Sequence, residues 1–273
     1  MFRIALLLLL TLTNFPAFAE DKQLTLADAK AQFAQAKREF DDAWTKTKQK
    51  LPETQFNELI GVQRHWDLMR DELAEIAAYD ALPEKVKIAA GRIAAGLDGK
   101  PANPKAANAV INDTTAYFAT ATYLCRDRTN WLRGLAEGEE QPITGLWNDG
   151  SHGYVRIVEE KGRLLFDFNY DGGRDKVFGF AGIAEWNQNI GWFSDKVRDK
   201  EKTAKNGETN IAFIRRGLRL EIMIRNADYY RGKGPFSFDG SYYRAASIDA
   251  QIKAATVRAA ESGKSAAWSS VLR

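Results

Sequence analysis

The sequence predicts an α+β chain in which an N-terminal four-helix antiparallel bundle is followed by an antiparallel β-barrel or sandwich. From about Thr25 to Ala136 the apolar residues recur at spacings of three and four, which is typical of amphipathic helices. After Pro142 apolar and polar residues alternate, which is typical of strands. This change of period predicts a helical domain over residues 20–140 and an antiparallel β domain over residues 141–244.

Capping and helix-breaking residues place the first three helices. Thr25 with Asp28 forms a variant of the capping box. Pro52 ends the first helix, because proline cannot continue a helix and restricts Leu51 before it. The first two helices are joined by this short connection and should form an antiparallel hairpin. A third helix is expected from about Pro83 to Leu97.

The apolar faces of the helices can be read from the same spacing. After a loop that holds Pro101 and Pro104, a fourth and longer helix is expected to end near Gly134. One face of this helix carries Val110, Thr114, Tyr117, Ala121, Leu124, Arg128 and Trp131. The first helix buries a stripe of Phe33, Ala36, Phe40, Trp44, Thr47 and Leu51, and the second carries Phe56, Leu59, Gln63, Trp66, Arg70 and Leu73 on one face.

Alternation predicts about six to eight strands in the second half. From Arg163 to Tyr170, Leu164 and Phe166 face one way and Asp167 faces the other. Further strands are expected over residues 154–160, 177–184, 191–193, 211–215, 218–225 and 240–244. Residues 245–273 are expected to form a weakly helical or flexible tail, since serines follow Gly263.

The first 19 residues have the features of a secretory signal peptide. Arg3 precedes an apolar run from Ile4 to about Leu12, and Ala17-Phe18-Ala19 forms an A-x-A cleavage site. The alternative, an N-terminal membrane anchor, needs about 20 apolar residues, and the run has about half that number. Cleavage near Ala19 predicts a periplasmic or secreted protein, soluble and without a membrane span.

Composition excludes several classes of function. The chain has 39 Lys and Arg against 36 Asp and Glu, a net charge of +3 that argues against a nucleic-acid partner. Cys125, His65 and His152 lack the spacing of a metal site, so no metal or cofactor is expected. Cys125 has no second cysteine for an intramolecular disulfide, and we expect it to be buried.

Residues 37–75 resemble the N-terminal helical region of the periplasmic lysozyme-inhibitor family LprI. The resemblance lies in the Leu-Pro junction and in Gln63, Trp66, Arg70 and Asp71, which have the family's Q-x-x-W-x-x-x-R-D spacing. We call these four the motif residues. Their spacing places Gln63, Trp66 and Arg70 along one helix face, where Trp66 can pack on the first helix.

The resemblance implies a binding protein that blocks a lysozyme or related muramidase, and peptidoglycan is a further possible partner. Residues 145–157, 191–196 and 226–244 look like the β domain sometimes attached to such helical regions. Family members usually carry a disulfide-bonded Cys shortly after the Arg-Asp pair, whereas this chain has Ala74 there. Either packing replaces the disulfide, or the resemblance is to a diverged branch of the family.

No catalytic constellation emerges from the sequence, and we expect the protein not to be an enzyme. Ser151 and His152 are adjacent, so their side chains point apart in an extended segment, and no G-x-S-x-G elbow is present. The segment Gly232-Lys233-Gly234 lacks the strand, helix and Ser/Thr of a phosphate-binding loop. A surface turn and a flexible loop are the better interpretations.

The candidate binding loops are residues 149–154 and 229–237, because they combine glycines with donor side chains. The candidate contacts are Ser151, His152, Tyr230, Arg231 and Lys233. Tyr230 could equally close the barrel. The alternative function is a periplasmic module that binds glycans or proteins of the cell envelope, for which exposed aromatic rings would supply a stacking surface.

Overall fold

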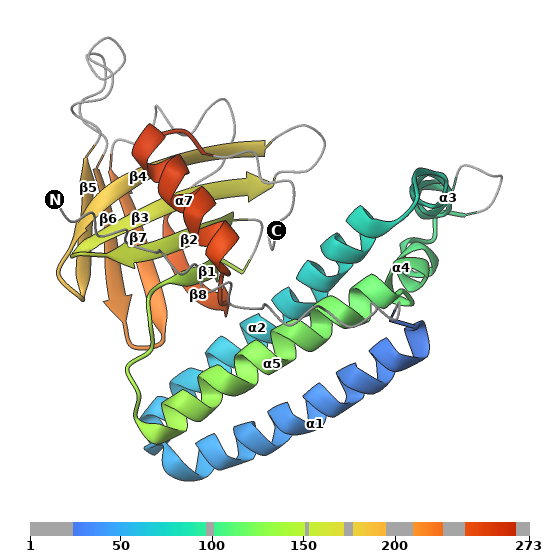
Figure 1. The fold of residues 1–273 in the computed structure, drawn as a ribbon, viewed down its shortest axis with the longest axis horizontal. Helices are drawn as coiled ribbons and strands as arrows, with labels where there is room; N and C mark the ends of the chain where they lie inside the picture. The colour runs from blue at the N-terminus through green and yellow to red at the C-terminus, as the bar shows by residue number, and fades with distance from the viewer. Residues whose placement is uncertain are drawn as a thin grey trace, which may run out of the picture.

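The computed structural model describes residues 24–96, 101–150, 153–171, 177–194, 210–225 and 238–265. Helices come first and strands follow, which confirms the α+β class and the antiparallel barrel (Figure 1). The helices are α1 (Leu26–Lys50), α2 (Glu53–Ala81), α3 (Glu84–Ala95), α4 (Pro104–Asn112), α5 (Thr115–Glu137) and α7 (Ala250–Ser262). The strands are β1 (Gly145–Asn148), β2 (Gly153–Glu160), β3 (Arg163–Asp171), β4 (Val177–Trp186), β5 (Ile190–Ser194), β6 (Asn210–Arg216), β7 (Arg219–Arg225) and β8 (Gly240–Ala246).

The predicted four-helix bundle is not confirmed, because the predicted fourth helix is two helices. Asp113 ends α4, and the Thr114 hydroxyl accepts a hydrogen bond from the backbone N–H of Tyr117 at 3.2 Å, which caps α5. Thr25 caps α1 in the same way, as the sequence predicted. Five described helices therefore precede the barrel.

The long helices α1, α2 and α5 lie side by side, with α5 between the other two (Figure 1). Each of the first two helices packs mainly on α5, and the two also meet directly where Phe40 and Trp44 of α1 contact Trp66 and Phe56 of α2. This central position suits α5, which buries residues around most of its circumference, among them Leu124, Arg128 and Leu132. The short helices α3 and α4 pair at the end of the bundle away from the barrel (Figure 1). None of the described helices is long and apolar enough to cross a membrane.

The eight strands form a closed barrel in which each strand pairs antiparallel with the next and β8 pairs with β1. Leu164, Phe166 and Phe168 of β3 are all buried in the barrel core, as the alternation predicted. Phe166 contacts four other rings at centroid distances of 4.9–5.6 Å, from Phe168, Phe180, Phe193 and Phe213. Side chains thus fill the centre of the barrel, as is usual for eight strands.

The two ends of the barrel differ in their connections. Consecutive connections of such a barrel alternate between its ends. At one end, which we call the turn end, short turns join β2 to β3, β4 to β5 and β6 to β7; Lys161, Gly162 and Gly217 adopt the positive φ that tight hairpin turns require. The connections that follow β1, β3, β5 and β7 all leave from the opposite end, which we call the loop end.

Helix α7 covers the outer face of β2, β3 and β4. Asp249 caps its N-terminus by accepting from the backbone N–H of Ile252 at 2.8 Å, and Gly263 ends it in the left-handed conformation. Arg156 and Asp167 lie opposite one another in the β2–β3 register and are both buried. Burial lowers the pKa of Arg156 to about 10, and the charge of Asp167 opposes this shift.

Candidate functional site

Trp66 of α2 joins the helices to the barrel. Its side chain is fully buried, and its indole Nε1 donates a hydrogen bond to the backbone oxygen of Ala245 in β8 at 3.1 Å. Its ring stacks on Phe40 of α1 at 5.6 Å between centroids. One apolar cluster runs from α1, α2 and α5 through Trp66 to the outer face of the barrel. Trp66 is therefore a packing residue.

Gln63 is hydrogen-bonded to Arg128, a second buried residue where the helices meet the barrel. We call this interface the helix–barrel joint. The side-chain oxygen of Gln63 accepts from Nε of Arg128 on α5 at 3.1 Å. The Arg128 guanidinium lies 3.9 Å from the ring centroid of Trp131 and 5.5 Å from that of Trp66, so both rings offer cation–π contacts. Burial, with a smaller contribution from the charge of Arg244, lowers the pKa of Arg128 to about 9.

Arg70 and Asp71 form a local ion pair beside Cys125. The Arg70 guanidinium contacts Asp71 at 2.7 Å and Asp67 at 3.5 Å. Burial lowers the pKa of Arg70, but the hydrogen bond and the negative charge of Asp71 raise it by more. The pKa of Arg70 is therefore raised overall. Gln63 and Trp66 therefore serve the interface of α2 with α5 and the barrel, whereas Arg70 and the half-exposed Asp71 pair with one another within α2. Ala74, which stands where the family carries a Cys, is fully buried.

Two further contacts join the barrel to α2. The imidazole of His65 meets the ring of Tyr243 edge-on at 4.1 Å between centroids. At the turn end, the backbone N–H of Leu218 donates to Oε1 of Glu58 at 3.2 Å. These contacts hold the barrel along α2 from the turn end toward the loop end.

An ion pair joins α5 to β8 within the same joint. The Arg244 guanidinium donates to Oδ2 of Asp127 at 3.2 Å, and the same oxygen accepts from the backbone N–H of Ser247 at 3.1 Å. Both charged side chains are largely buried, with exposed fractions of 5% and 12%. A buried pair of this kind fixes geometry, because each charge is stable there only beside the other.

The five candidate contacts, Ser151, His152, Tyr230, Arg231 and Lys233, lie outside the described residues. The strands that flank them are described. Asn148 at the end of β1 lies opposite Tyr243 of β8, so the connections from β1 to β2 and from β7 to β8 leave from neighbouring strands at the loop end. The first of these connections is closed at its base, where the Asn148 side chain donates to the backbone oxygen of Gly153 at 3.1 Å.

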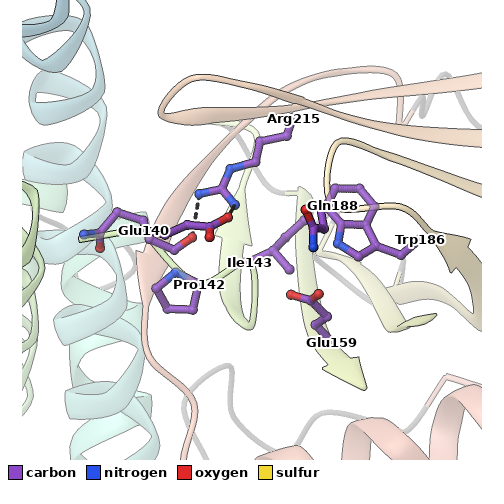
Figure 2. A pocket seen from close by; sticks show the side chains of 8 residues that line it. Glu140, Pro142, Ile143, Glu159, Trp186, Gln188 and Arg215 are labelled. Carbon is purple, nitrogen blue, oxygen red and sulfur yellow. Dashed lines mark hydrogen bonds and ion pairs between the residues drawn. The ribbon is translucent and has the colours of Figure 1, made fainter. Parts of the chain in front are cut away.

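A pocket at the turn end was not predicted from the sequence. It has a volume of about 240 Å³ and is lined by Glu140, Gln141, Pro142, Ile143, Glu159, Trp186, Gln188 and Arg215 (Figure 2). We call it the turn-end pocket. Its residues come from the segment after α5, from the ends of β2, β4 and β6, and from the turn after β4. No local sequence signal connects such scattered residues, so only the closed barrel brings them together.

Arg215 forms one wall of the turn-end pocket. Its guanidinium contacts the carboxylate of Glu140 at 3.5 Å and donates to the backbone oxygen of Gln141 at 2.5 Å (Figure 2). Glu159 and Gln188 lie on the other side, next to Trp186 and Ile143 (Figure 2). The pocket therefore combines carboxylate acceptors, amides and an aromatic ring with a cation that already has partners.

Within the described part of the chain, no group of three or more His, Cys, Asp or Glu side chains could hold a metal ion. Comparisons with protein-family models, with curated proteins and with solved structures found no match for this chain.

Proposed function

We propose that this chain is an exported, non-enzymatic inhibitor of lysozyme-type peptidoglycan hydrolases that blocks the catalytic cleft with loops of its barrel. The LprI-like motif behind a signal-like leader motivates the choice of partner. The observation that supports the proposal is the pairing of β1 with β8, because the described strands that flank the two candidate loops are neighbours at the loop end.

The motif residues support a structural role for the helices. Trp66 and Gln63 are buried against α1, α5 and β8, so their side chains offer a partner almost no surface. The helices then act as a platform that carries the barrel in one orientation. In this account the partner is met by loops of the barrel, which can differ in sequence without disturbing the joint.

The chemistry of the target suits donor-rich loops. Lysozyme-type enzymes use two carboxyl groups that flank the bond to be cleaved, in a cleft open to the sugar chain. Arg231, Lys233 and the hydroxyl of Tyr230 can donate hydrogen bonds to such carboxylates, and charge-assisted bonds are the strong ones. The bulk of two adjacent loops excludes the sugar. Ser151 and His152 of the other loop supply further donors.

An inhibition assay tests the proposal. The mature chain, beginning at Glu20, is titrated against c-type, g-type and bacterial lysozymes that are clearing a cell-wall suspension. We expect it to slow at least one class. Replacing Tyr230 and Arg231 by Ala should weaken inhibition by about tenfold or more, as loss of interface anchors does. The matched control is Arg216→Ala, an exposed arginine at the turn end that should leave inhibition unchanged.

The alternative function, binding to the cell envelope, gives a different result. A pull-down on purified sacculi without any lysozyme would capture the chain if it bound glycan directly. Capture by sacculi combined with no complex and no inhibition across the lysozyme panel would contradict the inhibitor proposal and favour the alternative.

A further inference from the structure

We propose that the turn-end pocket binds one neutral sugar ring, of the size of a single pyranose, through Trp186, Gln188 and Glu159. The pocket lies at the opposite end of the barrel from the candidate inhibitory loops. The proposal therefore stands independently of lysozyme inhibition, and it gives the barrel a second binding surface.

Trp186 supplies a hydrogen-bond donor and a small exposed part of its ring. The residue is 7% exposed and belongs to the barrel core, which fixes its ring in place. Figure 2 shows its indole nitrogen on the side of the ring that faces Gln188 and Ile143, toward the pocket. An indole N–H in such a position favours an oxygen acceptor, such as a sugar hydroxyl.

The other side chains complement a hydroxyl-rich ligand. An ionised Glu159 carboxylate only accepts hydrogen bonds, whereas the amides of Gln188 and Gln141 both donate and accept. Each sugar hydroxyl also donates and accepts, so such a ring can satisfy acceptors and donors together. Pro142, which is exposed, offers apolar surface beside these polar groups.

The charged side chains of the turn-end pocket disfavour an anionic ligand. Two carboxylates, of Glu140 and Glu159, line the pocket against the single guanidinium of Arg215. That guanidinium already bonds Glu140 and the backbone of Gln141, so it offers little to a phosphate or carboxylate. The volume of about 240 Å³ is below the range of about 300–1,000 Å³ for pockets that hold drug-sized ligands, which fits one ring.

The backbone around the pocket is fixed before any ligand arrives. Gln188 has a φ of 76°, which is unusual for a residue with a side chain, and the Asn187 side chain holds this turn by accepting from the backbone N–H of Ile190 at 2.8 Å. The backbone N–H of Arg215 donates to the oxygen of Asn189 at 2.8 Å. Such preorganisation lowers the entropy lost on binding.

NMR of the indole N–H groups tests this proposal on the full mature chain. The chain has seven Trp, and Trp186→Phe assigns the signal of interest. Glucose and N-acetylglucosamine are added to about 50 mM, since a single ring with few hydrogen bonds should bind with a Kd of about 1–10 mM. We expect the Trp186 signal to move, while that of Trp192, half-exposed on the neighbouring strand, stays in place.

Matched variants locate the site. Glu159→Gln should weaken the sugar-induced shift by about tenfold, because a charge-assisted hydrogen bond becomes a neutral one. Glu160→Gln, on the next residue of β2 and outside the pocket lining, should have no effect. Ethylamine and glucose 6-phosphate are the competing probes. An unmoved Trp186 signal with both sugars, or a response to ethylamine or the phosphate ester alone, would overturn the proposal whether or not lysozyme is inhibited.

Discussion

Gly150 shows how closely the barrel is seated on α2. Its φ is +83°, and a Cβ built on it would lie 2.2 Å from Nε2 and 2.3 Å from Cε1 of His65. The His65 ring is itself held by Tyr243. The base of the β1–β2 connection therefore lies so close to α2 that this position has room for glycine but not for a residue with a Cβ atom.

Gly150→Ala should destabilise the protein by about 2–4 kcal/mol, because backbone strain and overpacking against His65 add together. The matched control is Gly138→Ala, with a φ of +75° and no neighbour within 4 Å, which carries strain alone. The free energy of unfolding is measured in urea for both variants and for the double variant that combines Gly150→Ala with His65→Ala. The comparison isolates the contribution of the clash. If the two glycine variants lose equal stability, or if removing His65 restores nothing, the described contact is wrong.

Cys125 is 1% exposed, and burial raises the pKa of its thiol while the nearby charge of Arg70 partly opposes that shift. The thiol should react with a disulfide reagent at least about tenfold more slowly in the native protein than in denaturant, because the thiolate is the nucleophile. A raised native pKa means that the folded state binds more protons above the unfolded pKa of about 8.5.

The stabilising contribution of the Cys125 thiol is therefore complete below about pH 8.5 and is lost as pH rises further. The difference in unfolding free energy between the wild type and Cys125→Ala should shrink between pH 7 and pH 10 in urea titrations. A difference that grows over this range would contradict the assigned direction of the shift.

At the scale of elements, the break between α4 and α5 depends on Thr114. Its hydroxyl accepts from Tyr117 of α5 and donates to the backbone oxygen of Ile111 at 2.9 Å in α4. Thr114→Ala should cost about 1 kcal/mol in urea unfolding, and Thr114→Asn, which can also cap, should cost less. Equal losses in the two variants would mean that the cap contributes nothing.

Residue spacing and capping residues predicted many helices and strands, but they did not predict which elements pack against one another. Leu164 and Phe166 alternate with Asp167, and this pattern places β3 in a barrel wall with its aromatic rings inside. The same pattern does not reveal that Asp167 is also buried, since α7, more than 80 positions along the chain, covers it. Periodicity identifies a buried face but not the element that buries it.

The candidate sites also depend on contacts between distant parts of the sequence. The spacing of Gln63, Trp66 and Arg70 predicted one helix face, and the structure adds that this face meets Arg128 and β8. Trp186 and Glu159 of the turn-end pocket carry no motif at all, because their proximity depends on barrel closure. Long-range pairing therefore limits what one sequence can predict about a site.

At the scale of the whole molecule, the joint makes helices and barrel one unit. A continuous apolar cluster, the Trp66 hydrogen bond and the buried pair of Asp127 with Arg244 all cross it. Urea unfolding followed by far-UV circular dichroism, which reports the helices, should coincide with near-UV circular dichroism, which reports the aromatic barrel core. Two separated transitions would show that the parts unfold independently.

The central claim is that the loop end of the barrel blocks a peptidoglycan hydrolase. Hydrogen–deuterium exchange of the mature chain, alone and with a lysozyme that it inhibits, tests this claim most directly. The account predicts slower exchange in residues 149–154 and 229–237 of the complex, with α2 and the turn end unchanged. No complex with any lysozyme, or protection confined to the helices, would contradict it.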